Sequence, residues 1–340
     1  MPRPVTLTTG QWADLSLDEI CSSAASMGYD GLELALRPSL FDLEKAAASR
    51  TYCDGVRERM SGYGLRCWAL SSHAIGKCVA DLYDPRLDRF VPPACQGKPG
   101  EIRRWAIAQM EMVPAAAANM GVAIITSFMG SPIWRYFYSF PQTSEAMIED
   151  GFDEVAKLWR PILDIFTEYG IAFALEAHPS EIAFDYYTAE RLIRELDHPA
   201  FGLNFDPSHL WWQGIDPVLF LRDFAPYVRH VHMKDAAVRR DGRAGVLGSH
   251  LPFGDHRRGW DFRSVGRGDV DFESIIRTLN DIGYTGPLSV EWEDNGMDRM
   301  YGARESLEYV RRLQFPPSDR DFDTSIGYIS RKRDNGNGGE

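Results

Sequence analysis

The sequence has few of the features that mark secreted or membrane-spanning proteins. Its 340 residues include five cysteines that form no CxxC pair: Cys21, Cys53, Cys67, Cys78 and Cys95. An odd number of isolated cysteines predicts reduced thiols in a cytoplasmic protein, not a disulfide framework or a cysteine zinc site. No run of about 18 uncharged apolar residues occurs, and residues 1–4 lead into no apolar stretch. Neither a membrane helix nor a signal peptide is therefore predicted.

Basic side chains are also in deficit. The chain has 37 Lys and Arg against 49 Asp and Glu, a formal net charge of −12. A basic surface that follows phosphates is therefore not expected, and nucleic acid and membrane are not predicted as partners. No GxGxxG follows the first predicted strand and no GxxxxGK[ST] is present, so a dinucleotide site and a P-loop are not predicted. The lack of a phosphate-binding loop favours an unphosphorylated substrate. Hydrophobic residues make up 44% of the chain, enough for a large core.

Short β-branched or aromatic runs alternate with longer amphipathic segments along the whole chain. The runs predict eight strands, over residues 5–8, 31–36, 66–71, 122–128, 171–176, 201–206, 228–233 and 287–293. Helical periodicity is found between them, for example over 17–27, 102–120, 152–169 and 272–282. Several strands follow a glycine that suits the end of a helix. This repeat predicts an α/β protein with a closed (β/α)8 TIM barrel over residues 1–313.

Two segments fall outside the repeat. Residues 236–268 are polar and rich in Arg and Gly, and they are expected to form a long loop insertion after the seventh strand. Such a loop would serve as a lid over the site or as a subunit contact. Residues 314–340 are expected to form a C-terminal tail, of which the last ten or so residues are disordered.

The last four predicted strands end in ionisable side chains, where a barrel enzyme carries its chemistry. Residues two apart in a strand share a face, so four neighbouring strands direct a carboxylate or imidazole toward one point. Converging carboxylates repel one another unless a cation neutralises them. We therefore predict one divalent metal ion bound by Glu176, Asp206, His232 and Glu291, with His230 packed lower in the barrel. Three oxygen donors and one imidazole favour Mn²⁺, with Mg²⁺ or Co²⁺ as alternatives, over structural zinc.

Other polar and aromatic side chains near predicted strand ends are candidate substrate-binding residues. They are His73, His178, His209, Lys234, Trp12 and Trp134. Each also has a structural interpretation. His73 would cap the loop after the third strand, Lys234 would pair with Asp235, and the two tryptophans would belong to the core.

At these residues the chain resembles the xylose isomerase-like barrel superfamily, over roughly residues 4–313. The most specific matching segments are 28–34, 176–179, 204–209, 230–235 and 290–293. The resemblance implies the same metal set and two catalytic glutamates, Glu176 and Glu291, that move protons on opposite faces of a sugar. It also implies a substrate contact for His209. Where the epimerases of this superfamily carry an arginine six residues after the metal histidine, this chain has Val238.

Residues 69–81, 248–255 and 258–264 are similar to a bacterial group of sugar phosphate isomerases/epimerases. The large subunits of C-glycoside deglycosidases resemble this group in turn. The expected function is proton abstraction next to the carbonyl of a keto-sugar, leading to isomerisation, epimerisation or, as the specific prediction, elimination of the aglycone from a 3-oxo-glycoside. The expected partner is a small-molecule sugar or glycoside, and a second copy or a small β-type subunit is the candidate protein partner. The alternatives are an endonuclease IV-like DNA repair nuclease and a non-catalytic sugar-binding barrel.

Overall fold

Eight parallel strands close into a barrel in the computed structural model, which describes residues 2–248, 250–318, 322 and 326. The strands are β1 (Val5–Thr8), β2 (Gly31–Ala35), β3 (Arg66–Ser71), β4 (Ile124–Ser127), β5 (Ala172–Glu176), β6 (Phe201–Phe205), β7 (Val228–Met233) and β10 (Leu288–Val290). They follow one another around the barrel in chain order, and β10 closes it by pairing with both β7 and β1. The predicted (β/α)8 barrel is confirmed.

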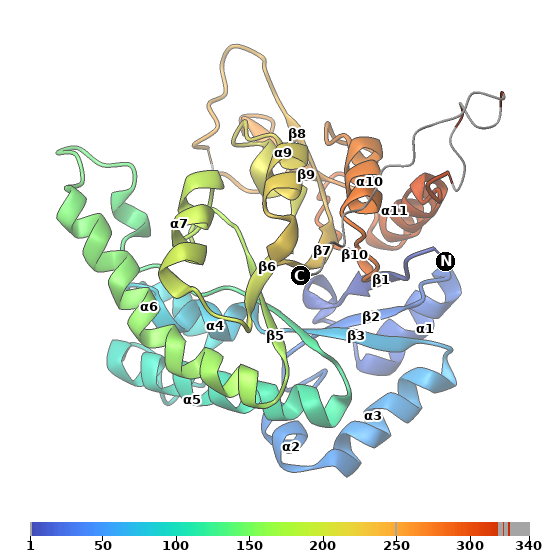
Figure 1. Cartoon of the computed structure of the whole chain (residues 1–340), viewed down its shortest axis with the longest axis horizontal. Coiled ribbons are helices and arrows are strands. Elements are labelled where there is room, and N and C mark those ends of the chain that lie inside the picture. Colours follow the sequence, from blue (N-terminus) through green and yellow to red (C-terminus); the bar gives the residue numbers. More distant parts are fainter. Residues whose placement is uncertain (1, 249, 319–321, 323–325, 327–340) are drawn as a thin grey trace, which may run out of the picture.

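Helices surround the barrel (Figure 1). They are α1 (Leu17–Met27), α2 (Leu43–Ala48), α3 (Arg50–Gly62), α4 (His73–Ala80), α5 (Pro99–Met120), α6 (Glu145–Glu168), α7 (Tyr186–Leu196), α8 (Pro207–Trp211), α9 (Pro217–Asp223), α10 (Phe272–Asp281) and α11 (Arg299–Leu313). Short 3-10 turns are η1 (Gly10–Trp12), η2 (Pro85–Phe90), η3 (Trp134–Tyr136) and η4 (Ala225–Tyr227). Helix α1 has the predicted limits because a capping box of Ser16 and Glu19 begins it and Gly28, with φ of 100°, ends it.

One glycine sets how closely α4 approaches the barrel. Gly76 lies against the end of β4, where a β-carbon would overlap the backbone oxygen of Phe128 and the hydroxyl of Ser127. Only glycine allows this approach without displacing the helix. Since His73 is the first residue of α4, the approach also fixes the position of His73.

The insertion after β7 differs from the expected polar loop. Within residues 236–268 and the residue before them, β8 (Asp235–Val238) and β9 (Trp260–Arg263) pair as an antiparallel ribbon. Ala236, Trp260 and Phe262 form a small apolar cluster of their own, and Trp260 stacks on Trp212 with ring centroids 4.3 Å apart. The prediction of a loop was wrong for these two segments, because residues 239–259, most of them polar or glycine, separate the two strands in sequence.

Asp235 ties the ribbon to the segment that follows it. Its carboxylate accepts hydrogen bonds from the backbone N–H groups of Ala236, Gly266, Gly268 and Val270. Lys234, for which a pair with Asp235 was the structural interpretation, instead forms ion pairs with Glu291 and Glu293, so that interpretation was wrong.

The remaining sequence predictions concern cysteines, membrane helices and the tail. All five cysteines are free, and all but Cys95 are buried. Among the described residues, no helix is long and apolar enough to cross a membrane. The disorder expected for the last ten residues falls outside the described part of the chain.

Candidate metal centre and active site

The four predicted metal ligands come together at the carboxyl ends of four neighbouring strands. Glu176 ends β5, Asp206 follows β6, His232 lies in β7, and Glu291 follows β10. One ligand atom of each residue lies within 4.8 Å of those of the other three. The backbone N–H of Glu291 still donates to the carbonyl of Met233, which keeps this glutamate beside β7 although β10 has ended.

The donor set fits a divalent cation. Asp206 Oδ2 is buried and has no hydrogen-bond partner among the residues that the structure describes. Glu291 Oε2 is buried as well, and it lies 3.0 Å from His232 Nδ1, a nitrogen that Glu176 shares. Buried carboxylate oxygens are costly to leave unpaired, so the cluster has a place for a further positive partner. Three carboxylates with one imidazole are donors that suit a hard or borderline divalent ion.

Burial and mutual repulsion set the ionisation of this cluster. Burial works to raise the pKa of Glu176, but hydrogen bonds from His209, His232 and His73 outweigh it and hold the pKa well below its usual value. Burial also opposes charge on Glu291, yet the charges of Lys234 and His232 lower its pKa to about 2. Both glutamates are therefore ionised at neutral pH.

Asp206 behaves differently from the two glutamates. Burial, together with the negative charges of Glu176 and Glu291, raises its pKa against the opposing pull of His209 and Lys234. Of the three carboxylates, Asp206 is the one whose charge is disfavoured by its surroundings. A bound cation would relieve this penalty directly.

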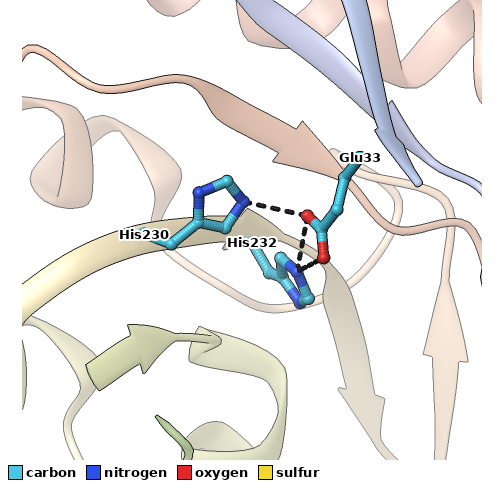
Figure 2. Close-up of side chains that lie close together, drawn as sticks. All are labelled: Glu33, His230 and His232. Carbon is cyan, nitrogen blue, oxygen red and sulfur yellow. Dashed lines mark hydrogen bonds and ion pairs between the residues drawn. The ribbon is translucent and has the colours of Figure 1, made fainter. Parts of the chain in front are cut away.

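His232 is held from behind by Glu33 of β2 (Figure 2). Its Nε2 lies 3.2 and 3.1 Å from the two carboxylate oxygens of Glu33, while its Nδ1 lies 3.1 Å from Glu176 and 3.0 Å from Glu291. Glu33 also accepts from His230 Nε2 at 2.9 Å and from Thr126 Oγ1 at 2.6 Å. The Nε2–H of His232 is thus directed at Glu33, and Nδ1 faces the metal cluster.

The contact between Glu33 and His232 sets the pKa of both side chains. Burial alone would raise the pKa of Glu33, but the facing rings of His232 and His230 hold it well below its usual value. Burial alone would lower the pKa of His232, but Glu33, Glu176 and Glu291 raise it well above its usual value. In the absence of a cation, His232 is therefore a charged imidazolium between carboxylates.

Four of the predicted substrate-binding residues line the cavity above the metal cluster: His73, His178, His209 and Lys234. His73 Nε2 lies 3.2 Å from Glu176 Oε2, and His209 Nε2 lies 3.2 Å from Glu176 Oε1. Lys234 Nζ lies 3.3 Å from Glu291 and 2.9 Å from Glu293. The ring of His178 packs on His209 with centroids 4.1 Å apart, and burial, then His209, lowers the pKa of His178.

The structure does not bring the two predicted tryptophans to this cavity. Trp12 is fully buried in the core, with the guanidinium of Arg299 over its ring at 4.5 Å. Trp134 is half-buried and packs against Phe137 and Phe184. Neither is among the residues lining the cavity. Full burial contradicts the predicted substrate contact of Trp12, whereas that of Trp134 stays a prediction. An aromatic side chain near a strand end suits the core as well as a ligand.

Sequence reasoning assigned no role to three residues of the site. Glu33 orients His232, and Asn204 Nδ2 donates to Glu176 Oε2 at 2.9 Å. Gln11 Nε2 donates to Glu291 at 2.7 Å and to Glu293 at 3.0 Å. The signal for Glu33 and Asn204 was present, because each is a polar residue inside an otherwise apolar strand. No pattern in the sequence marks Gln11.

The cavity has a volume of about 490 Å³ and opens at the carboxyl ends of the strands. Its floor holds Glu33, Glu176, His232 and Glu291, and its walls include aromatic residues from outside the barrel strands, among them Phe253 and Phe262 of the insertion. The position that carries an arginine in the epimerases, Val238, does not line it. A polar floor with aromatic walls is typical of a small-molecule site.

The sequence and the fold are both similar to those of known barrel proteins. The sequence model of the family described as xylose isomerase-like TIM barrel matches residues 21–313. The uncharacterized protein YfiH of Bacillus subtilis is 26% identical over 329 residues, covering 91% of this chain and 98% of that protein. Inosose dehydratase of Clostridium perfringens is 28% identical over 167 residues, so the match spans 49% of this chain and 53% of that protein. The crystal structure of the 3-keto-D-glucoside 4-epimerase YcjR of E. coli superposes with a TM-score of 0.64 at 18% identity, covering 91% of this chain and 99% of that one.

Proposed function

Because this chain belongs to the xylose isomerase-like TIM barrel family, we propose that it is a divalent-metal-dependent enzyme that abstracts a proton next to the carbonyl of a keto-sugar. One observation carries the proposal. Two ionised glutamates, the buried Glu176 and the partly buried Glu291, share a four-residue cluster that suits a single cation, at the floor of a cavity that fits a small molecule. Mn²⁺ is the proposed ion, with Mg²⁺ and Co²⁺ as alternatives.

The chemistry is divided between the ion and the side chains. A divalent ion in this cluster supplies positive charge that stabilises the negative charge developing on the carbonyl oxygen. Glu176 or Glu291 accepts the proton from the carbon next to the carbonyl, since both carboxylates are ionised at neutral pH. His73 and His209 each lie 3.2 Å from an oxygen of Glu176, where they orient the carboxylate and can donate a proton.

The specific reaction that we propose is elimination from a 3-oxo-glycoside. The proton on C2 moves to a glutamate, and the electron pair of the C2–H bond forms a double bond between C1 and C2. The bond between C1 and the aglycone breaks, and its electron pair leaves with the aglycone. An imidazole, His73 or His209, supplies the proton that the aglycone takes up. Relatives named dehydratases, whose name denotes elimination of water, support elimination as the proposed reaction.

The DNA repair nuclease has less support. An endonuclease IV-like site would need three zinc ions, whereas the described residues offer one four-residue group and one three-residue group that shares His232 with it. Both oxygens of Glu33 in the smaller group are already engaged by hydrogen bonds. An intact ligand set argues likewise against a sugar-binding barrel that has lost its chemistry.

The test is release of the aglycone by the Mn²⁺-loaded protein from aryl 3-oxo-glucosides, followed by absorbance of the free phenol. Glu176→Gln and Glu291→Gln should each lower the rate by about 10²–10⁴-fold. Glu168→Gln, an exposed substitution at the end of α6, is the matched control and should retain the wild-type rate. A folded, Mn²⁺-loaded protein that releases no aglycone and exchanges no solvent deuterium into keto-sugars would overturn the proposal.

A further inference from the structure

We propose that the insertion after β7 builds a second subsite, which binds a flat apolar group attached to the sugar through Phe253 and Phe262. The inference rests on the proposed function, because it takes the sugar itself to bind at the metal cluster. It adds that the substrate has two parts, a polar ring over the cation and an aromatic aglycone against the insertion.

The two phenylalanines lead from the metal cluster toward solvent. Lys234 Nζ lies 3.3 Å from Glu291 and 4.3 Å from the centroid of the Phe262 ring. The ring of His209 meets Phe262 edge-on with centroids 5.4 Å apart. Phe253 continues the row, with its ring 5.3 Å from that of Phe262 and tilted by 32°. Both phenylalanines line the same cavity as the catalytic glutamates. A group attached to a bound sugar would therefore extend along these two rings.

The ring of Phe253 is fixed in place although it is 45% exposed. The guanidinium carbon of Arg258 lies 4.2 Å from the centroid of this ring and 4.6 Å from that of Trp260. Arg258 is only 2% exposed, and its Nη1 donates to the carbonyl of Leu251 at 2.7 Å. A buried arginine between two aromatic rings is a specific packing arrangement that limits the movement of Phe253.

The backbone on either side of Phe253 is fixed as well. Asn295 Nδ2 donates to the carbonyl of Phe253 at 2.7 Å, and Asp261 Oδ2 accepts from the N–H of Gly254 at 2.7 Å. Gly254 has φ of 86°, which favours glycine and turns the chain directly after the phenylalanine. The insertion thus holds a large apolar ring at the mouth of the cavity. A ring that is already ordered loses little entropy when a ligand covers it.

The cavity has room for a second ring. Cavities of about 300–1,000 Å³ hold whole drug-sized molecules, which are larger than a single sugar ring. The cavity holds about 490 Å³, so space remains beside the sugar. Phe262 is only 3% exposed, with Lys234 over its ring, so a flat aromatic group gains from burial and stacking chiefly at Phe253, which is 45% exposed.

An arginine in the cavity wall offers a competing interaction for the group attached to the sugar. Arg37, from the chain after β2, also lines the cavity and is exposed. An anionic substituent on the sugar would be drawn to this arginine rather than to the aromatic rings. The test therefore compares three non-reacting glucosides that differ only in the group at C1: phenyl, methyl and carboxypropyl.

Dissociation constants of the Mn²⁺-loaded full chain are measured for these glucosides by NMR titration. The phenyl glucoside should bind about tenfold more tightly than the methyl glucoside. In Phe253→Ala this ratio should fall to about one, and Phe253→Tyr, which keeps the ring, should restore it. Tyr169→Ala is the matched control, since Tyr169 is 47% exposed and precedes β5 at the other end of the barrel.

Three results would overturn the inference: no preference for phenyl, a preference for carboxypropyl, or a preference that survives in Phe253→Ala. Absence of binding by all three glucosides counts as no preference. The proposed function is judged by deuterium exchange into keto-sugars instead, so the two can fail separately.

Discussion

Removing the carboxylate of Glu33 should weaken metal binding although Glu33 is not one of the four proposed ligands. Glu33 accepts the Nε2–H of His232 and so directs Nδ1 toward Glu176 and Glu291. Loss of such a partner behind a metal-binding histidine costs about 10- to 100-fold in affinity, which is about 1.4–2.8 kcal/mol. We expect this loss in Glu33→Ala.

The same substitution should also destabilise the fold. His232, His230 and Thr126 all donate to Glu33. His230 Nε2 would keep the hydroxyl of Ser289 at 3.1 Å and Thr126 Oγ1 the carbonyl of Leu70 at 3.5 Å, whereas Nε2 of His232 would be left as a buried donor without its acceptor. Such a donor costs about 1–3 kcal/mol, so the free energy of unfolding should fall by about that amount. Glu33→Gln keeps one carbonyl oxygen as an acceptor. It should retain most of the stability and lose no more than about tenfold in metal affinity.

The Mn²⁺ affinity is measured by isothermal titration calorimetry at pH 8, because protons compete least for His232 at this pH. The free energy of unfolding is measured by urea denaturation. Ser289→Ala is the matched control. Ser289 Oγ lies 3.1 Å from His230 Nε2 and 2.5 Å from Thr6 Oγ1, so this variant reaches the hydrogen bonds of Glu33 only through His230. Its Mn²⁺ affinity should stay within about threefold of the wild type. A folded Glu33→Ala protein that binds Mn²⁺ as tightly as the wild type would refute the assigned role of Glu33.

Three further predictions concern protons, the insertion and helix packing. Burial opposes charge on His232, but three facing carboxylates raise its pKa, so a metal ion must displace a proton from this imidazole. Mn²⁺ affinity should therefore rise with pH by up to about tenfold per pH unit. Calorimetry in two buffers should detect about one released proton per bound ion. An affinity independent of pH would contradict this. Asp235→Ala should lower the free energy of unfolding by about 3 kcal/mol and speed amide exchange at the base of the ribbon, whereas unchanged exchange would show that Asp235 does not anchor it. Gly76→Ala should lower the free energy of unfolding by about 1–3 kcal/mol, because a β-carbon at this position overlaps β4. Gly55→Ala in α3, where the β-carbon meets open space, should raise it by up to about 1 kcal/mol. Thermal melts that rank the two variants in the other order would contradict the packing argument.

The strand pattern was sufficient to predict the barrel, because parallel strands buried on both faces keep continuous apolar runs. The limits of β7 were predicted as found, whereas β10 ends three residues before the predicted limit of 293. Glu291 and Glu293 leave the strand and turn toward Lys234 and Gln11, contacts that the strand pattern cannot reveal.

The four proposed ligands could be found from the sequence because each is local to a strand end and the barrel brings strand ends together. Glu33 could not be given a role in the same way. Its partner His232 is 199 residues away, and only the closed barrel shows that β2 and β7 direct side chains at one another. The ribbon was missed for a similar reason, since β8 and β9 pair across a long polar segment. Trp12 was misassigned because its sequence position does not distinguish the core from the cavity.

The most direct test of the central claim is anomalous diffraction from a crystal of the Mn²⁺-loaded protein. The account predicts one strong manganese peak per chain, with oxygen or nitrogen atoms of Glu176, Asp206, His232 and Glu291 all about 2.0–2.6 Å from it. A peak at any other place in the chain, or a peak that fewer than three of these side chains contact, would contradict it.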